Sequence, residues 1–413
     1  MGCVDYIDNS FYENMSNREM ELIKEHPCYN FKAHNNARMH IPIAPKCNIQ
    51  CNYCNRKYDC VNESRPGVTS EVLTTREAIE KIEFVKQKIQ NLSVIGIAGP
   101  GDALANWENT KEVVKLIKEK YPNITICLST NGLMLDKYKE EIIKLGIKHI
   151  TITINSIDKT VGSKIYEFVK YEDKIYKGEE GAEILQENQF KGLKYLSENG
   201  VLCKINIVLI KGINDEHIKE VVDKVKEYGA FMTNIMPLIP AKGTRFEDNP
   251  LVSKKELDKI RKECSLDLRQ MFHCQQCRAD AIGKLTEDKS LEFKDFTRKK
   301  TERIRFAIAS KDNKLINQHF GHVDRFYIYE YSNDKIKFVE ERGIEKYCSG
   351  KENCDDKIPK MDLIKDIVKD CKALLCVRIG YVPKKTLRKN GIEIFETYDL
   401  IEEGIKKIVN KID

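Results

Sequence analysis

The sequence predicts an α/β protein whose larger part is a partial or complete (β/α) barrel and whose smaller part is a second α/β domain. Three features carry this prediction. Short β-branched runs alternate with amphipathic stretches between residues 40 and 240, a stretch rich in charge follows at 284–303, and a fresh β-branched run begins at 304. Repeated strand–helix–strand units are right-handed and build parallel sheets, and about six units fit a barrel. An open doubly wound sheet is the structural alternative.

The elements of the larger part follow in order along the chain. The β-branched runs predict strands at residues 40–44, 93–99, 124–129, 149–154, 202–209 and 233–238. Between them, apolar residues recur three and four positions apart, which predicts helices at 75–90, 110–120, 182–198 and 216–227. The barrel is favoured because three cysteines follow the first strand, and the loops after barrel strands collect at one face, where catalysis occurs.

The smaller part repeats the α/β pattern on a shorter scale. It shows strands at 304–309, 325–331, 336–340 and 373–377, a helix at 362–369, and further short segments at 386–388 and 392–395 before a terminal helix. We therefore divide the chain into an N-terminal extension at 1–35, the barrel and a Cys-x2-Cys segment at 36–283, a charged linker at 284–303, and the last domain at 304–413.

Charge and hydropathy argue against a nucleic-acid-binding or membrane protein. The net charge of +6 arises from 70 basic and 64 acidic residues, which are interspersed rather than gathered on one basic face. No apolar run approaches the roughly eighteen residues of a membrane span, and residues 1–24 are polar and acidic, unlike a signal peptide. We therefore expect a cytoplasmic protein that binds neither nucleic acid nor a membrane.

The cysteines indicate iron. In a reducing compartment the fifteen cysteines are candidate metal ligands rather than a disulfide framework. Cys47, Cys51 and Cys54 form a C-x3-C-x2-C word, and because an iron–sulfur cube takes one thiolate per iron, such a word leaves one iron open to another ligand. A zinc knuckle or buried structural cysteines are the alternatives, but three thiolates would leave zinc one ligand short.

This spacing, with Tyr53 before its third cysteine, resembles the signature of the radical S-adenosylmethionine (SAM) enzymes. The resemblance implies a [4Fe-4S] cluster on Cys47, Cys51 and Cys54 whose open iron binds SAM. Reductive cleavage of SAM then yields a 5'-deoxyadenosyl radical.

Short polar motifs follow the later predicted strands, and their side chains suit the binding of the cofactor. Gly99 and Gly101 let the backbone approach a ligand closely, and the Asp102 carboxylate suits an ammonium group. Neutral groups suited to a ribose or carboxylate follow the other strands; with Tyr53 they complete the predicted SAM-binding set, namely Ser129, Asn131, Asn155 and Asn206. Ordinary turns are the alternative for each word.

Several further words resemble the NifB family of nitrogenase-cofactor biosynthesis enzymes. They lie at 26–28, 37–40, 55–67 and 273–281, so the resemblance runs from about His26 to Ala281. It implies two additional [4Fe-4S] clusters as substrates, which are fused around a carbon from the SAM methyl group, with an added sulfur, into an [8Fe-9S-C] precursor.

The same resemblance implies ligands for these substrate clusters. One set is Cys28, Cys127 and a histidine, with His26 preferred over His34 and His40 because it shares a word with Cys28; the other is Cys60, Cys274 and Cys277. Taken singly, Cys127 in an apolar strand is more often a core residue.

The word at 317–322 resembles the cofactor-binding domain of the NifX and NifY type, which implies a ribonuclease-H-like fold and a role in holding or delivering precursors. His319 and His322 either ligate a cluster there or order a loop. The implied partners are an iron–sulfur cluster donor, an electron donor such as ferredoxin, and downstream carrier or maturation proteins.

Three other functions compete with this interpretation. Another radical SAM enzyme with auxiliary clusters is expected to end in a cysteine-rich domain, and a non-catalytic iron–sulfur scaffold or carrier needs neither the barrel nor the open-site word. A regulatory iron sensor is expected to carry a helix-turn-helix with a basic face, and the sequence shows none.

Overall fold

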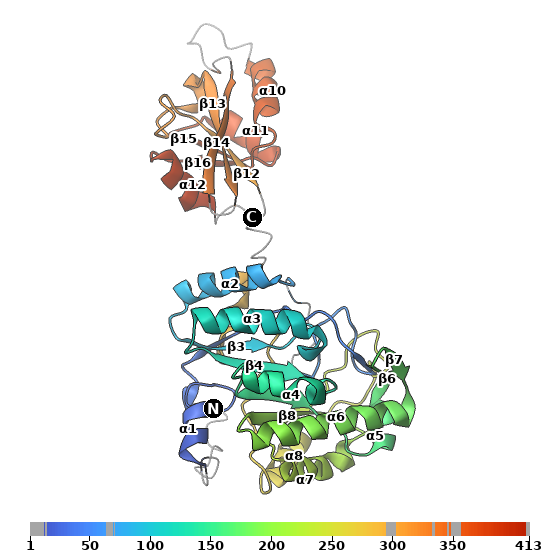
Figure 1. Cartoon of the computed structure of the whole chain (residues 1–413). Coiled ribbons are helices and arrows are strands. Elements are labelled where there is room, and N and C mark those ends of the chain that lie inside the picture. Colours follow the sequence, from blue (N-terminus) through green and yellow to red (C-terminus); the bar gives the residue numbers. More distant parts are fainter. Residues whose placement is uncertain are drawn as a thin grey trace. The chain divides into compact units, whose positions relative to one another are not determined.

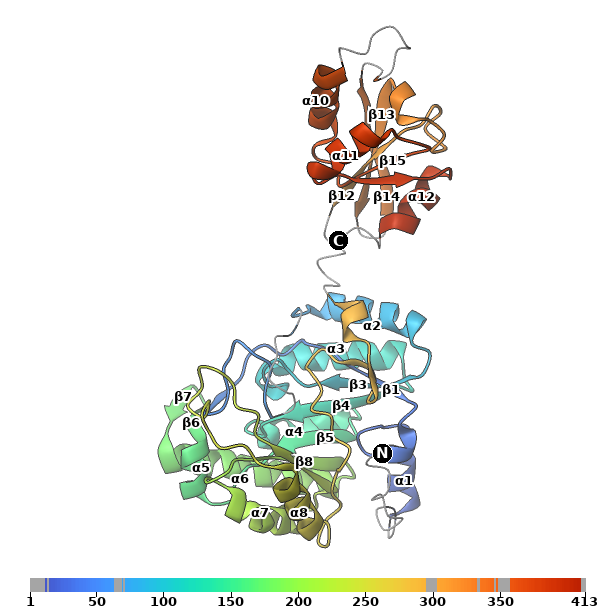
Figure 2. The ribbon, with the colours of Figure 1, turned by 180° about the vertical axis from the view of Figure 1, so that it is seen from behind.

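In the computed structural model the chain divides into two units, Met1–Phe296 and Thr297–Asp413, and each is described by itself (Figures 1 and 2). The structure describes residues 12, 15–62, 69, 71–294, 303–332, 335–344, 347 and 357–409. No helix among these residues is long and apolar enough to cross a membrane.

Six parallel strands form the centre of the first unit. In spatial order they are β1 (Ala37–His40), β3 (Leu92–Ile97), β4 (Thr125–Thr130), β5 (His149–Thr153), β8 (Leu202–Leu209) and β9 (Met232–Pro237). Antiparallel β10 (Ile282–Lys284) and β11 (Glu287–Asp288) extend the sheet beyond β1. The predicted succession of parallel strand–helix units is confirmed.

Helices pack against one face of this sheet. They are α2 (Thr75–Lys88), α3 (Trp107–Lys120), α4 (Leu135–Lys144), α6 (Gly178–Glu198), α7 (Ile218–Glu227) and α8 (Lys254–Cys264). Isoleucines at alternate strand positions, such as Ile95, Ile150 and Ile205, share one buried core with apolar residues of these helices. The opposite face of the sheet is therefore the concave interior of a barrel.

An irregular segment spans the gap between the two edges of the parallel sheet. At the β9 edge, Thr233 N donates to the Arg269 carbonyl and Met271 N donates to the Thr233 carbonyl, each at 2.8 Å. At the β1 edge, His40 N donates to the Ala281 carbonyl at 2.8 Å, and β10 follows. The barrel is thus six parallel strands whose edges are joined by residues 269–284.

Smaller elements attach to this frame. A three-stranded sheet joins β2 (Ile49–Cys51) to β6 (Tyr166–Tyr171) and β7 (Lys174–Tyr176), which follow α5 (Lys159–Ile165). Helix α1 (Asn17–Ile23) lies in the N-terminal extension. Short 3-10 helices are η2 (Phe31–Ala33), η3 (Leu104–Asn106), η4 (Asp215–His217) and η5 (Ser290–Phe293). Residues 284–294, in the stretch predicted as a linker, bring Phe293 into the main core; residues 295–302 of that stretch lie outside the described residues.

Two predicted segments lie in other elements or at other positions than the sequence indicated. The first strand covers residues 37–40 rather than 40–44, because Pro42 has no N–H with which to continue a ladder. Residues 386–388 lie inside helix α11 (Tyr381–Lys389), where Leu387 is buried.

The second unit is a mixed sheet between helices. Its order is β14 (Lys335–Gly343), β13 (Arg325–Ser332), β12 (Ile304–Ile308), β15 (Ala373–Cys376) and β16 (Glu393–Glu396), with β12, β15 and β16 parallel. Helices α10 (Lys357–Val368) and α11 cover one face, α12 (Ile401–Val409) covers the other, and η6 (Phe320–His322) follows β12. This architecture agrees with the predicted small α/β domain.

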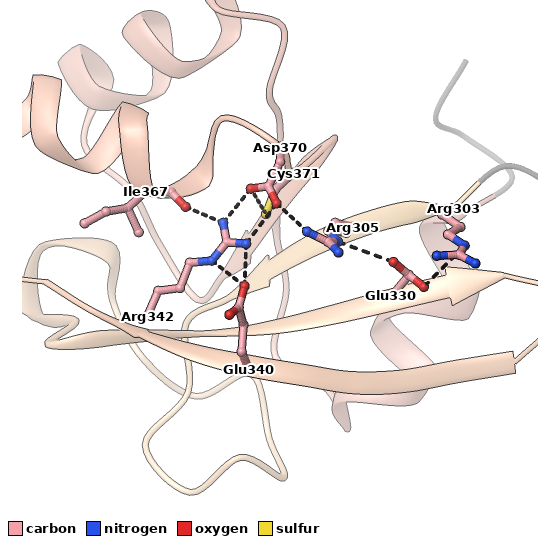
Figure 3. A network of polar contacts seen from close by, with 8 residues as sticks. All are labelled: Arg303, Arg305, Glu330, Glu340, Arg342, Ile367, Asp370 and Cys371. Carbon is pink, nitrogen blue, oxygen red and sulfur yellow. Dashed lines mark hydrogen bonds and ion pairs between the residues drawn. The ribbon is translucent and has the colours of Figure 1, made fainter.

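A polar network crosses one side of this second unit (Figure 3). The Asp370 carboxylate, just after α10, accepts from Arg342 of β14 at 2.8 Å and from Arg305 of β12 at 2.7 Å. Glu330 and Glu340 accept further hydrogen bonds from the same two arginines. The network joins three strands to the end of a helix.

Candidate active site

Three thiols lie on a short anchored loop after β1. Cys51 belongs to β2, which pairs with β6, while Cys47 precedes that strand and Cys54 follows it. Cys54 N donates to the Cys51 carbonyl at 3.0 Å, and Gln50 Nε2 donates to the Cys54 carbonyl at 2.7 Å. Burial raises the pKa of Cys47 to about 11, and it also raises the pKa values of Cys51 and Cys54. The thiols therefore stay protonated until a metal displaces their protons.

The turn at 99–102 packs against this loop. Ala44 N donates to the Gly99 carbonyl at 3.1 Å, Gly101 N donates to the Ala44 carbonyl at 2.6 Å, and Asp102 N donates to the Lys46 carbonyl at 2.9 Å. The buried Asp102 carboxylate accepts from four groups, which are the N–H groups of Leu104, Ala105 and Asn131 and the hydroxyl of Thr130. These donors fill the lone-pair sites of a carboxylate. Asp102 thus fixes the loop and has no site left for the ammonium group expected of it.

Three of the predicted binding residues connect the interior strands to the loop. Tyr53 is fully buried; its hydroxyl donates to Asn62 Oδ1 at 2.5 Å and accepts from Asn155 Nδ2 at 2.7 Å. Asn206 Nδ2 donates to the Asn62 carbonyl at 2.8 Å. These side chains hold the loop against β5 and β8, and direct contact with the cofactor stays a prediction for each.

A cavity beside the loop brings the other predicted binding residues together, except Gly99. It is lined by Cys47, Cys60, Asn62, Gly101, Asp102, Ser129, Thr130, Asn131 and Thr153. Asn131 Nδ2 lies 3.7 Å from Cys47 Sγ. Ser129 Oγ and Thr153 Oγ1 are buried and have no hydrogen-bond partner within the described part of the chain. Because buried polar atoms are nearly always paired, these hydroxyls indicate a polar ligand.

The other cysteines lie in two places, and their division between two substrate clusters stays a prediction. Cys28, Cys127 and Cys274 contact one apolar cluster around Tyr29. Burial raises the pKa of Cys28 to about 11, and the charged groups that act on it include Lys204, Cys277 and Cys274. Cys28 and Cys127, which the prediction groups together, therefore lie near Cys274 of the other predicted set.

Cys60 lies beside the three-cysteine loop instead. Burial raises the pKa of its thiol, and Cys54, Cys47 and Cys51 raise it further. No three His, Cys, Asp or Glu side chains among the described residues converge on a point that holds one metal ion. A four-iron cube takes one ligand per iron, so its ligands surround a cube rather than a point.

The three histidine candidates differ in geometry. His34 is exposed. His26 is buried, and its Nδ1 accepts from Cys28 N at 3.3 Å. His40 Nδ1 lies 3.0 Å from the Arg278 carbonyl, which only accepts, so Nδ1 carries the proton and Nε2 keeps its lone pair.

Sequence reasoning missed a set of polar residues on the concave face. These buried side chains are His149, Thr151, Thr153, Lys204 and Asn234. Strands of a parallel sheet usually read as continuous apolar runs, because both faces are buried. The alternation of polar and apolar residues at 149–153 was therefore the available signal of a polar interior.

In the second unit, His319 and His322 lie together, with ring centroids 5.4 Å apart. His319 Nδ1 accepts from Gly321 N at 3.1 Å, which orders the loop. Burial lowers the pKa of His319, and His322 and Arg378 lower it further. Whether these imidazoles bind a cluster stays a prediction.

Comparisons with known proteins match both units. The family described as Radical SAM superfamily matches residues 41–225, and the family described as Dinitrogenase iron-molybdenum cofactor matches residues 302–411. The FeMo cofactor biosynthesis protein NifB of Frankia alni is 40% identical over 447 residues, which cover 94% of this chain and 88% of that protein. NifB of Bradyrhizobium diazoefficiens is 43% identical over 431 residues, which cover 93% and 86%.

Among solved structures, methylornithine synthase (PylB) is 16% identical with a TM-score of 0.41, over 62% of this chain and 71% of that chain. A likeness at that score adds nothing to the assignment.

The chain carries a three-thiolate loop on this barrel, as radical chemistry on SAM requires. The family match over residues 41–225 places it among the radical SAM enzymes. The cofactors of that class are a [4Fe-4S] cluster and SAM. The similarity to curated relatives over most of both chains narrows the assignment. The chain belongs to the NifB family of FeMo cofactor biosynthesis proteins.

Proposed function

We propose that this chain fuses two [4Fe-4S] clusters into an [8Fe-9S-C] precursor of the nitrogenase cofactor, taking the carbon from the methyl group of SAM and adding one sulfur. The observation that carries the proposal is the second group of cysteines. Cys28, Cys127 and Cys274 contact one apolar cluster inside the barrel that also carries the Cys47 loop. Thiolates in that position suit iron–sulfur substrates.

The residues of the Cys47 loop fit the resident cluster. Cys47, Cys51 and Cys54 would hold three irons and leave the fourth for SAM. When bound, this cluster supplies the electron that cleaves SAM. The unpaired hydroxyls of Ser129 and Thr153 would bind polar groups of the cofactor, because they are buried beside Cys47.

The substrate clusters would take their ligands from Cys28, Cys60, Cys127, Cys274, Cys277 and one histidine. We assign the histidine to His40 rather than His26. A metal-bound imidazole commonly donates its other N–H to a carbonyl, which is what His40 Nδ1 does toward Arg278. His26 instead uses Nδ1 as an acceptor, so its neutral ring carries the proton on Nε2 and has no lone pair to offer there.

The chain's own contribution is to position these groups and to exclude water. Tyr29 closes the interior from the N-terminal side; it is fully buried, and its single O–H is shared between the carbonyls of Ile150 at 3.2 Å and Leu202 at 3.3 Å. His273 Nε2 lies 3.0 Å from the Pro27 carbonyl and so ties the segment at 269–284 to the N-terminal extension. A closed interior protects a radical from side reactions.

We further propose that the second unit holds or delivers the product, supported by its match to the iron-molybdenum cofactor family and by the adjacent His319 and His322. Under this proposal an iron–sulfur cluster donor and an electron donor such as ferredoxin act before the reaction. Downstream carrier or maturation proteins act after it.

The test is to incubate the anaerobically reconstituted protein with SAM and a strong reductant and to quantify S-adenosylhomocysteine and 5'-deoxyadenosine. Methyl transfer followed by radical abstraction predicts both products, and the Cys54→Ala variant should lose 5'-deoxyadenosine. Deoxyadenosine alone from the unsubstituted protein would contradict the proposal and indicate a radical enzyme with another substrate.

A further inference from the structure

Two buried imidazoles lie in contact inside the barrel, and neither belongs to the proposed set of cluster ligands. His26 and His149 are each 2% exposed, and their ring centroids lie 4.8 Å apart. Both rings also pack on Tyr29, at 4.6 Å and 4.9 Å between centroids. The two histidines come from different elements, the N-terminal extension and β5.

His26 presents a buried N–H that lacks an acceptor. Nδ1 accepts from Cys28 N, so Nδ1 holds a lone pair and the ring proton is on Nε2. Nε2 has no hydrogen-bond partner in the described part of the chain. A buried donor left in this state is costly, so the site is built for an acceptor.

His149 is in the same condition. Its imidazole carries at least one N–H in either protonation state, and the backbone of Leu22 lies near enough to act on the ring. Neither ring nitrogen meets a partner at hydrogen-bonding distance and angle among the residues described. In the parallel ladder, His149 stands opposite Cys127, and both side chains point to the concave face.

The surroundings indicate which acceptor fits. Cys28 and Cys127 contact the same apolar cluster as Tyr29, and the charge of Lys204 acts on both imidazoles and on Cys28. A lysine charge and two imidazole N–H donors make a site for a group that is anionic and rich in acceptors. The sulfides and thiolates of an iron–sulfur cluster are such acceptors.

We propose that His26 and His149 donate hydrogen bonds to sulfur atoms of the substrate cluster held by Cys28 and Cys127, and that they position this cluster without ligating its iron. This inference rests on the proposed function. It makes both histidines positioning residues, and it explains how a cluster held by few thiolates is retained.

The donors also give the cluster a direction. His149 lies six residues before Asn155, which touches Tyr53 of the cysteine loop, so it lies up to roughly 20 Å away along the chain at about 3.3 Å per residue, toward the other end of the barrel. Hydrogen bonds to sulfur raise the reduction potential of a cluster. The sulfides that face the imidazoles therefore carry less negative charge than those that face the SAM site, which stay the better nucleophiles.

The experiment uses the full chain with Cys47, Cys51 and Cys54 replaced by alanine, so that only substrate clusters contribute to the signal. In this background His149→Phe and His26→Phe are compared with His149→Gln, which retains an N–H donor, and with Tyr29→Phe as a control in the same ring cluster. Each protein is reconstituted anaerobically, and iron content, the midpoint potential from an EPR-monitored titration, and nitrogen hyperfine coupling are measured. The fluorescence of Trp107 verifies that each variant is folded.

We expect both phenylalanine variants to shift the midpoint potential to more negative values with little change in iron content. The glutamine variant should recover part of that shift, and Tyr29→Phe should show none. Unchanged potentials, or loss of a strong nitrogen coupling together with iron, overturn the donor role, the latter in favour of ligation. A background protein that binds no iron overturns the proposed function itself, and the inference with it.

Discussion

Gly101 illustrates how tightly single residues hold the cysteine loop. A Cβ at this position would lie 2.7 Å from the Ala44 carbonyl oxygen and closer still to that of Lys46, and both are backbone atoms that cannot rotate away. We therefore expect Gly101→Ala to displace the start of the loop. The expected cost is about 2 kcal/mol of stability, together with a clear loss of iron bound after anaerobic reconstitution.

The control is Gly178→Ala in the same unit, because a Cβ at Gly178 would meet no atom within 4 Å and only its positive φ adds strain. Iron content and the urea midpoint, followed by Trp107 fluorescence, are compared for the two variants. Full iron binding by the Gly101→Ala protein would contradict the prediction that the added Cβ disrupts the cysteine loop.

At the scale of residues, the sequence predicts functional groups that lie close together in one motif, because their spacing indicates the chemistry. It does not predict groups that come together only when the chain folds. The word around Cys47 is local, so it could be read directly. His149 stands alone in a β-branched run, and it meets His26 only because the N-terminal extension folds under β5. Asp102 was noticed for its charge, but its task depends on four donors, three of them backbone N–H groups that no pattern reveals.

Among the elements, the network around Asp370 joins β12 and β14 to the end of α10 (Figure 3). Hydrogen bonds from the guanidinium of Arg342, and then from that of Arg305, hold the pKa of Asp370 well below its usual range. Because the folded-state pKa is depressed, the stabilisation is present above the ordinary aspartate pKa and is lost as pH falls toward the folded value. The side chain is partly exposed, so we expect Asp370→Asn to cost about 1 kcal/mol at neutral pH.

Trp107 is the only tryptophan and lies in the first unit, so hydrogen exchange in β12 and β14 is the suitable measurement for this variant. The exchange rates of Asp370→Asn should exceed those of the unsubstituted chain at pH 7, and the difference should begin to shrink only below about pH 4. Asp324→Asn, which removes an exposed pair with Arg325, serves as the control and should change little. A difference that persists unchanged in acid would exclude the ionised Asp370 as its source.

The elements themselves were largely predictable, because β-branched runs and helical periodicity are signals within one segment. Five of the six parallel strands cover the predicted segments to within two residues at either end. The first strand was misplaced by Pro42. The sheet of β2, β6 and β7 escaped prediction because β2 is only three residues long and lies inside the cysteine word. The segment that joins the barrel edges has no regular pattern, so only its backbone hydrogen bonds reveal it.

At the scale of the whole molecule, the positions of the cores and of the candidate ligands indicate which unit carries the chemistry. Every proposed ligand and every residue lining the cavity belongs to Met1–Phe296, which has its own buried core. The second unit has apolar clusters on both faces of its sheet. Each unit therefore buries enough apolar surface to be treated as a separate folding unit.

We accordingly expect a fragment of residues 1–296 to fold, to bind iron, and to form S-adenosylhomocysteine and 5'-deoxyadenosine at rates within about twofold of the full chain, a difference of about 0.4 kcal/mol in activation free energy. The physical reason is that no residue assigned to the chemistry lies beyond residue 281. Product formation by the fragment and the full chain is compared under identical reconstitution, with Trp107 fluorescence as the measure of folding. A folded, iron-loaded fragment that forms neither product would assign the second unit a part in the chemistry itself. A fragment that forms both products but fails to pass the fused cluster to an acceptor protein would confine the role of the second unit to holding and delivery.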